Sequence, residues 1–202
     1  MLFRSDNLNI GVYRNTGGAQ GRFLQANPAI VQMFGYAAEA DFLQAQVSDL
    51  YADPQERQRF MTEILSHGQV TNRALHLRRK DGTTFWGAVT ARVAYDDQGE
   101  VKWLDGVLED VTARREAEAR QRLAAAVFDA TRDAILVTDG EGRIIAVNPA
   151  FSTLTGYPEA EVRGRSPRLL WSERQPEAYF EAIWQTVADE GVWQSEFWAR
   201  RK

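Results

Sequence analysis

Cysteine is absent from all 202 residues of the chain. Its absence excludes disulfides, thiolate metal sites, cysteine nucleophiles and chromophores attached through a thioether. The sequence also lacks any run of about 18 apolar residues, and no basic segment followed by an apolar one opens the chain. These absences predict a cytoplasmic protein that makes no membrane contact within this chain.

Histidine is scarce, and the net charge of −4 gives no basic footprint for nucleic acid. The two histidines, His67 and His76, show no metal-ligand spacing, and no Ser-His-Asp arrangement or glycine-rich phosphate loop is present. We therefore expect no catalytic residue, no metal site and no nucleic-acid partner in this chain. His67, at the predicted end of a helix, is expected to contact the last carbonyl groups of that helix.

One pattern occurs twice. Asn27-Pro28 precedes an apolar segment that ends at Gly35-Tyr36, and Asn148-Pro149 precedes another that ends at Gly156-Tyr157. The copies are 121 residues apart, which is far more than the roughly 20–50 residues of a solenoid repeat. The sequence therefore predicts a duplicated domain of about 100 residues.

The first copy predicts an α+β domain. Strands are expected at about 9–13, 22–26, 70–79, 83–95 and 101–110, and helices at about 28–35, 41–50 and 54–67. Asn27 suits an N-cap because Pro28 follows at the first helical position. This order gives one antiparallel five-stranded sheet with helices on one face.

Residues 113–130 are strong helix formers without glycine or proline, and they predict a helix that connects domain 1–112 to domain 131–202. A heptad seam along this helix would consist of Ala119, Leu123, Ala126 and Ala130. Because three of these four are alanine, the seam favours packing on neighbouring segments or a partner copy over a coiled coil formed by this helix alone.

The second domain repeats the opening strands and the Asn-Pro helix. A long helix is expected from Gln175-Pro176, and alternation over 192–198 predicts one strand after it. The corresponding strand of the first domain is followed by two more, so the second sheet is expected to lack its last two strands. Because such an open edge invites mispairing, we expect the natural protein to continue past Lys202.

Together these motifs resemble PAS domains, the sensory modules of bacterial signalling proteins. Besides the Asn-Pro and Gly-Tyr pairs, Arg79-Lys80-Asp81-Gly82 precedes a strand, and Glu109-Asp110-Val111-Thr112 closes the last one before a charged helix. The resemblance covers residues 8–112 completely and 127–202 as a truncated unit. It implies a five-stranded sheet around a small pocket, ligand sensing, and dimerisation through flanking helices.

The resemblance also suggests cofactors, although the cofactor stays unknown. Haem sensors need an axial ligand, and His67 at a helix end is a poor candidate, so haem is disfavoured. Flavin held without a covalent step stays open, with Asn148, Trp184 and Trp193 as cofactor-binding candidates. Ala199 stands where such relatives often carry asparagine, and a flavin–cysteine adduct is excluded. The alternative is that these tryptophans, like others in the chain, are core or sheet-face residues.

Two tryptophans of the first domain, Trp86 and Trp103, lie on predicted strands. Each faces either the pocket or a partner chain. Gly87 and Gly106 beside them are possible positions of a β-bulge.

The closing motif of the first domain predicts a signal relay made of Asp110, Thr112 and Arg114. A side-chain oxygen at the junction of strand and helix can cap the helix or pair with Arg114 or Arg115. Such contacts would tie sheet movement to helix position. The alternative is an ordinary helix cap without a signalling role.

We therefore predict a homodimeric sensory and dimerisation module that binds a small molecule and signals to an effector in the same polypeptide. The resemblance implies a diguanylate cyclase, a cyclic-di-GMP phosphodiesterase or a histidine kinase as that effector. A flavin-binding redox sensor and a ligand-free structural adaptor are the two alternatives.

Overall fold

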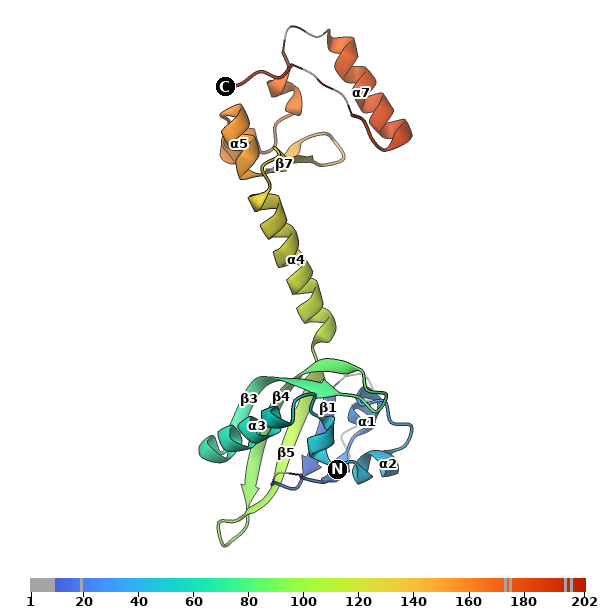
Figure 1. Cartoon of the computed structure of the whole chain (residues 1–202), viewed down its shortest axis with the longest axis vertical. Coiled ribbons are helices and arrows are strands. Elements are labelled where there is room, and N and C mark those ends of the chain that lie inside the picture. Colours follow the sequence, from blue (N-terminus) through green and yellow to red (C-terminus); the bar gives the residue numbers. More distant parts are fainter. Residues whose placement is uncertain (1–9, 19, 173, 175, 195, 197) are drawn as a thin grey trace. The chain divides into compact units, whose positions relative to one another are not determined.

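A computed structural model describes residues 10–18, 20–172, 174, 176–194, 196 and 198–202. Positions 9, 175, 195 and 197 of the predicted elements lie outside the described residues. The chain forms two compact units, Met1–Glu118 and Ala119–Lys202, and helix α4 contributes residues to both (Figure 1). The predicted domain limits 1–112, 113–130 and 131–202 stay predictions.

The first unit has the predicted order of strands and helices. Its elements are β1 (Ile10–Asn15), β2 (Phe23–Ala26), α1 (Pro28–Met33), α2 (Glu39–Gln44), the 3-10 helix η1 (Val47–Leu50), α3 (Pro54–His67), β3 (Gln69–Arg78), β4 (Thr84–Tyr95) and β5 (Val101–Asp110). The strands form one antiparallel sheet in the order β2-β1-β5-β4-β3. The helices cover one face of this sheet (Figure 1), which confirms the predicted α+β fold.

Alternating burial along β5 shows which face is covered. Leu104, Gly106 and Leu108 are buried on the helix side, whereas Val107 and Glu109, which alternate with them, are exposed. The same two-residue period runs along β4. Large apolar side chains from both layers fill the space between sheet and helices; the largest of them are Phe42, Phe60, Phe85, Ile30 and Ile64.

The two glycines interpreted as bulge positions have a different role. The register between β4 and β5 continues through both of them and shifts only between Ala94 and Tyr95, so the bulge prediction is wrong. A Cβ atom on Gly106 would lie 2.5 Å from the hydroxyl oxygen of Tyr13, and one on Gly87 would lie 2.5 Å from a methyl group of Leu108. Both glycines therefore leave room for large side chains in the core.

Helix α4 (Thr112–Ala130) follows β5 directly. None of its residues is buried, and Leu123 and Val127 expose 66% and 59% of their surface. Packing on neighbouring segments, which we expected, is therefore not seen for these side chains within the described residues.

The second unit repeats the beginning of the first. Its elements are β6 (Leu136–Thr138), β7 (Ile144–Val147), α5 (Pro149–Thr155), α6 (Glu159–Val162), the 3-10 helix η2 (Pro167–Leu170) and α7 (Glu177–Glu190). Strands β6 and β7 form a two-stranded antiparallel sheet. Ile144, Val147, Phe151 and Val162 form its buried core. Gly156 (φ 79°) and Gly191 (φ 77°) end α5 and α7 in left-handed conformations that favour glycine.

The prediction of a strand over 192–198 is wrong for the residues that the structure describes. The described residues of that segment form no strand, and Ala199 makes a single isolated bridge to Trp171. Its counterpart in the first unit, β3, is stabilised by pairing with β4 along its length. An alternating pattern forms a strand only where a neighbouring strand supplies backbone partners.

Candidate functional site

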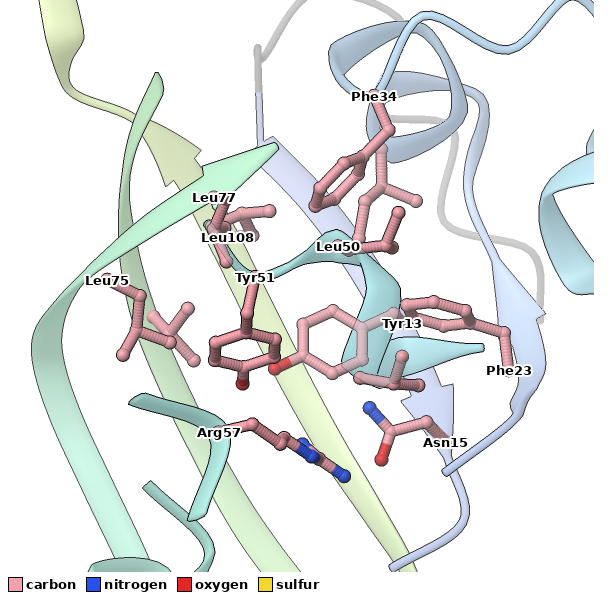
Figure 2. A pocket seen from close by; sticks show the side chains of 13 residues that line it. Tyr13, Asn15, Phe23, Phe34, Leu50, Tyr51, Arg57, Leu75, Leu77 and Leu108 are labelled. Atoms are coloured by element: carbon pink, nitrogen blue, oxygen red, sulfur yellow. The ribbon is translucent and has the colours of Figure 1, made fainter. Parts of the chain in front are cut away.

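A small cavity of about 30 Å³ lies inside the first unit, between the sheet and the helices (Figure 2). Its apolar wall comes mainly from β3, α1 and η1. The lining residues are Tyr13, Asn15, Phe23, Ile30, Phe34, Val47, Leu50, Tyr51, Arg57, Leu75, Leu77, Val89 and Leu108. Four of them carry polar groups, and these lie together at one end of the cavity (Figure 2).

Arg57 is the charged member of this polar end, and it is only 2% exposed. Its Nη2 donates to the carbonyl oxygen of Gly18 over 3.1 Å, and its guanidinium carbon lies 5.7 Å from the centre of the Tyr51 ring. Its Nε and the Oδ1 of Asn15, which is also 2% exposed, are buried without a hydrogen-bond partner among the described residues.

The two phenol groups of the cavity stay protonated at neutral pH. Burial raises the pKa of Tyr13, and the nearby Tyr51 raises it further, although Arg57 acts in the opposite direction. Burial also raises the pKa of Tyr51, against the opposing effect of Arg57. Both hydroxyl groups are therefore hydrogen-bond donors inside the cavity.

The second unit holds a much larger cavity, of about 390 Å³. It is lined by Ala134, Leu136, Phe151, Leu154, Thr155, Pro167, Leu170, Trp171, Ile183, Trp184, Trp193 and Ala199. Two of the three predicted cofactor-binding residues, Trp184 and Trp193, thus come together here with Trp171. A cavity of this size and apolar lining is typical of small-molecule sites.

The third predicted residue, Asn148, does not line this cavity. Its Oδ1 accepts hydrogen bonds from the backbone N–H groups of Phe151 and Ile135, and its Nδ2 donates to the carbonyls of Phe128 and Asp133. Asn148 is 1% exposed, and its side chain is hydrogen-bonded to four backbone groups. It therefore caps α5 and joins this helix to the preceding segment.

Asn27 repeats this arrangement in the first unit. Its Oδ1 accepts from the backbone N–H groups of Ile30 and Val12, and its Nδ2 donates to the carbonyl of Ile10. The Asn-Pro motif is therefore a structural element that is used in the same way twice.

Asn148→Ala is expected to lower the free energy of unfolding of the second unit by about 1–2 kcal/mol, because it removes a helix cap and leaves buried backbone groups unpaired. Urea denaturation followed by tryptophan fluorescence measures this loss. Thr153→Ala, on the exposed face of the same helix, is the matched control. Equal stability of the two variants would contradict the structural role.

The predicted relay residues Asp110 and Thr112 meet where β5 passes into α4. The backbone N–H of Thr112 donates to Asp110 Oδ1 over 2.9 Å. The Thr112 hydroxyl oxygen accepts from the backbone N–H of Trp86 on β4, over 2.8 Å. The first residue of α4 is therefore hydrogen-bonded to two neighbouring strands.

Asp110 pairs with an arginine other than the one expected. Its Oδ2 lies 2.7 Å from Nη2 of Arg79, just after β3, and the two side chains are 26% exposed each. Arg79 also donates to the carbonyl of Met33 at the end of α1, and its guanidinium carbon lies 4.2 Å from the centre of the Phe85 ring. Asp110 thus connects α4 to α1 through a single arginine.

Arg114, the third predicted relay residue, is exposed on α4 and makes no ion pair with Asp110 among the described residues. The neighbouring Arg115 instead lies over the ring of Trp86, with 4.4 Å between guanidinium carbon and ring centre. Trp86 and Trp103 stand on the uncovered face of the sheet, where His76 stacks on Trp86 and Arg14 lies over Trp103. Neither tryptophan lines the first cavity.

The pKa of the Asp110 carboxyl lies below its usual range. Burial alone would raise this pKa, but the hydrogen bonds from Thr112 and the Arg79 guanidinium outweigh it. A carboxyl whose pKa is lower in the folded chain stabilises the fold above its unfolded pKa. That contribution disappears as the pH falls through the folded pKa.

The histidines lie away from both cavities. His67 is exposed at the end of α3, where its Nδ1 is 2.9 Å from the Glu63 carbonyl oxygen, as expected for a histidine at a helix end. In the described part of the chain, no group of three His, Asp or Glu side chains is placed to hold a metal ion. Neither histidine lines the first cavity.

Sequence reasoning missed Arg57, Tyr51 and Arg79 as functional candidates. Arg57 lies on a helix rich in charged residues, and only its position on the same helix face as Phe60, Met61 and Ile64 could have marked it as buried.

Comparison with known families agrees with this architecture. Residues 18–113 match the PAS domain and residues 122–197 match the PAS fold. The chain therefore belongs to the PAS family and carries two such domains in tandem, which confirms the resemblance seen in the sequence. PAS domains are a sensory fold and not a catalytic family.

Two bacterial relatives are similar to parts of the chain. A nitrogen fixation regulatory protein of Klebsiella oxytoca is 29% identical over 99 residues, which are 49% of this chain and 20% of that protein. Blue-light-activated histidine kinase 1 of Erythrobacter litoralis is 31% identical over 158 residues, which are 73% of this chain and 39% of that protein. Both relatives support a sensory role.

A solved structure of an RNA-binding light-oxygen-voltage receptor is 26% identical in sequence to this chain, with a TM-score of 0.49. The match covers 59% of this chain and 35% of the receptor chain. The chain spans two fifths or less of the length of the curated relatives described above.

Of the helices that the structure describes, none is both long and apolar enough to traverse a lipid bilayer.

Proposed function

We propose that this chain is the sensory and dimerisation region of a bacterial signal-transduction protein. A ligand in a PAS cavity would shift the sheet, and α4 would pass the shift to an effector in the same polypeptide. The observation that carries this proposal is the junction at Asp110, where one carboxylate joins the first turn of α4 to Arg79 and so to α1. A shift of either helix or sheet must change these contacts.

Signalling by this route requires two arrangements for which the ligand has different affinities. The hydrogen bonds to Asp110 weaken steeply when their angles change. A small movement at the junction would therefore favour one of the two arrangements over the other. Exposed Leu123 and Val127 on α4 are the surface through which two copies would meet.

A histidine kinase is the effector that the similarity favours, since the Erythrobacter relative is one and matches 73% of this chain. A diguanylate cyclase or a cyclic-di-GMP phosphodiesterase is the alternative suggested by the sequence of the second domain. Kinase or cyclase activity of the protein that contains this chain distinguishes the two.

The second cavity is proposed to bind a flat, mainly apolar ring system. Trp171, Trp184 and Trp193 offer aromatic surfaces, and the volume of about 390 Å³ is within the range of small-molecule pockets. Flavin is the first candidate because the lining fits its ring faces. Ala199, however, offers no amide for the polar ring edge, and the Thr155 hydroxyl already donates to the Phe151 carbonyl.

The residues thus fit the flat part of a flavin, which would supply redox chemistry when bound. A redox sensor of this kind is our second candidate function. Without cysteine, adduct photochemistry of the flavin–cysteine type stays excluded, even though the Erythrobacter relative is activated by blue light.

The visible absorption spectrum of the purified chain, before and after addition of flavin mononucleotide, tests this proposal. Trp184→Ala is expected to weaken flavin binding by about tenfold or more, because it removes an aromatic face worth on the order of 1–3 kcal/mol. Titration of flavin fluorescence measures the change.

Trp198→Ala is the matched control, since Trp198 is 62% exposed and does not line the cavity. Equal losses in both variants would argue against binding in this cavity. No binding to the wild-type chain would leave other flat ligands or the ligand-free adaptor as the explanation.

A further inference from the structure

A positive charge is buried in the first unit without a negative one beside it. Arg57 is 2% exposed. Within the described part of the chain, its Nε has no hydrogen-bond partner and no carboxylate forms an ion pair with it. Among the described residues, its Nη2 donates to the neutral carbonyl of Gly18, and its side chain also forms a hydrogen bond with the neutral phenol of Tyr51. Removing an ion from water costs several kcal/mol unless a partner charge compensates.

Further donors surround the same space. At the polar end of the cavity the Tyr51 hydroxyl points toward Arg57, and the Tyr13 hydroxyl points toward Tyr51 (Figure 2). Because burial keeps both phenols protonated, the cavity presents donors from three side chains and one full positive charge. The Oδ1 of Asn15 is an acceptor at this end that has no hydrogen-bond partner among the residues described.

The volume limits what can fill the cavity. About 30 Å³ is close to the share of one molecule in liquid water, so flavin, haem and organic acids of several carbons do not fit. A halide, or an anion of a few atoms such as nitrate, is the largest charged species that the space admits.

We propose that this cavity binds a small monovalent anion the size of chloride, held by Arg57 with the hydroxyl groups of Tyr13 and Tyr51. The anion would compensate the buried guanidinium, and binding would therefore stabilise the packing of α3 on the sheet. This site lies within the first domain, so it does not depend on the ligand proposed for the second.

The experiment is a titration of the full chain with chloride, followed by the chloride NMR line width. Gluconate, which is too large for the cavity, keeps the ionic strength constant. The wild type is expected to give a saturable broadening that Arg57→Met abolishes. Arg59→Met, an exposed position on the same helix, should keep it. Nitrate should compete with chloride, and sulfate, which is larger and divalent, should not.

Tyr51→Phe keeps the buried charge and removes one donor, so the dissociation constant for chloride should rise about tenfold. This variant decides the question if near-ultraviolet circular dichroism shows that Arg57→Met does not fold. The proposal is overturned if the wild type shows no saturable broadening, which means that water alone fills the cavity. It is also overturned if Arg57→Met or Tyr51→Phe binds like the wild type, or if sulfate competes equally.

Discussion

Asp110→Ala is expected to leave the first domain folded and to abolish the control that this domain has over an attached effector. The substitution removes the ion pair with Arg79 and the hydrogen bond from the first residue of α4. Because both side chains of the ion pair are partly exposed, the loss in stability should be only about 1–2 kcal/mol. Hydrogen exchange in the first turn of α4 should rise, and effector activity should no longer differ with and without ligand.

Glu109→Ala is the control for this substitution. Glu109 is the preceding residue of β5 and is exposed on the opposite face of the sheet. It should retain both slow exchange in α4 and effector regulation. Unchanged regulation in Asp110→Ala would reduce the junction to an ordinary helix cap.

Gly106→Ala should cost the first domain about 2–3 kcal/mol of unfolding free energy, although alanine is apolar and the backbone there is ordinary. The added methyl group would lie 2.5 Å from the Tyr13 hydroxyl oxygen, so ring and strand must move apart in a packed core. Chemical denaturation followed by circular dichroism measures the loss.

A matched glycine separates this clash from the general effect of a glycine substitution. Gly140 has no neighbouring atom within 4 Å of an added Cβ and no positive φ, so Gly140→Ala should change stability little. Equal effects of the two substitutions would mean that Tyr13 is not fixed against Gly106.

The fold could be predicted because its signals are local. Asn27 and Asn148 stand directly before proline, and this pair starts a helix through contacts within a few residues. The alternation along β4 and β5 likewise reports one buried and one exposed face. The segment 192–198 has the same alternation but forms no strand in its described residues, because a pattern shows preference and cannot supply a pairing partner.

The site was less predictable because its contacts are distant in sequence. Asp110 was expected to pair with Arg114 or Arg115, which follow it in the chain, yet its partner is Arg79, which the sheet brings beside it. The sequence did not predict a role for Arg57, because a lone arginine in a charged helix is normally exposed to solvent.

Trp184 and Trp193 were predicted to bind the same cofactor only because of the resemblance to flavin-binding relatives. Both line one cavity in the structure. Asn148 was assigned to the ligand on the same grounds, yet its amide is fully used by the backbone. A resemblance to a family can thus predict where a residue lies without predicting what it binds. The Asn148 amide can form only a limited number of hydrogen bonds, and backbone groups already take four of them.

Helix α4, in which no side chain is buried, has a consequence for how such a protein can change over time. An α-helix turns by about 100° and advances by 1.5 Å with each residue. Since α4 is one continuous helix, the number of residues between Thr112 and Ala130 sets the angle between the directions in which these two residues project from the helix axis. Insertion of a single residue within the helix would change that angle by about 100°, whereas exchange of one exposed residue for another would leave it unchanged.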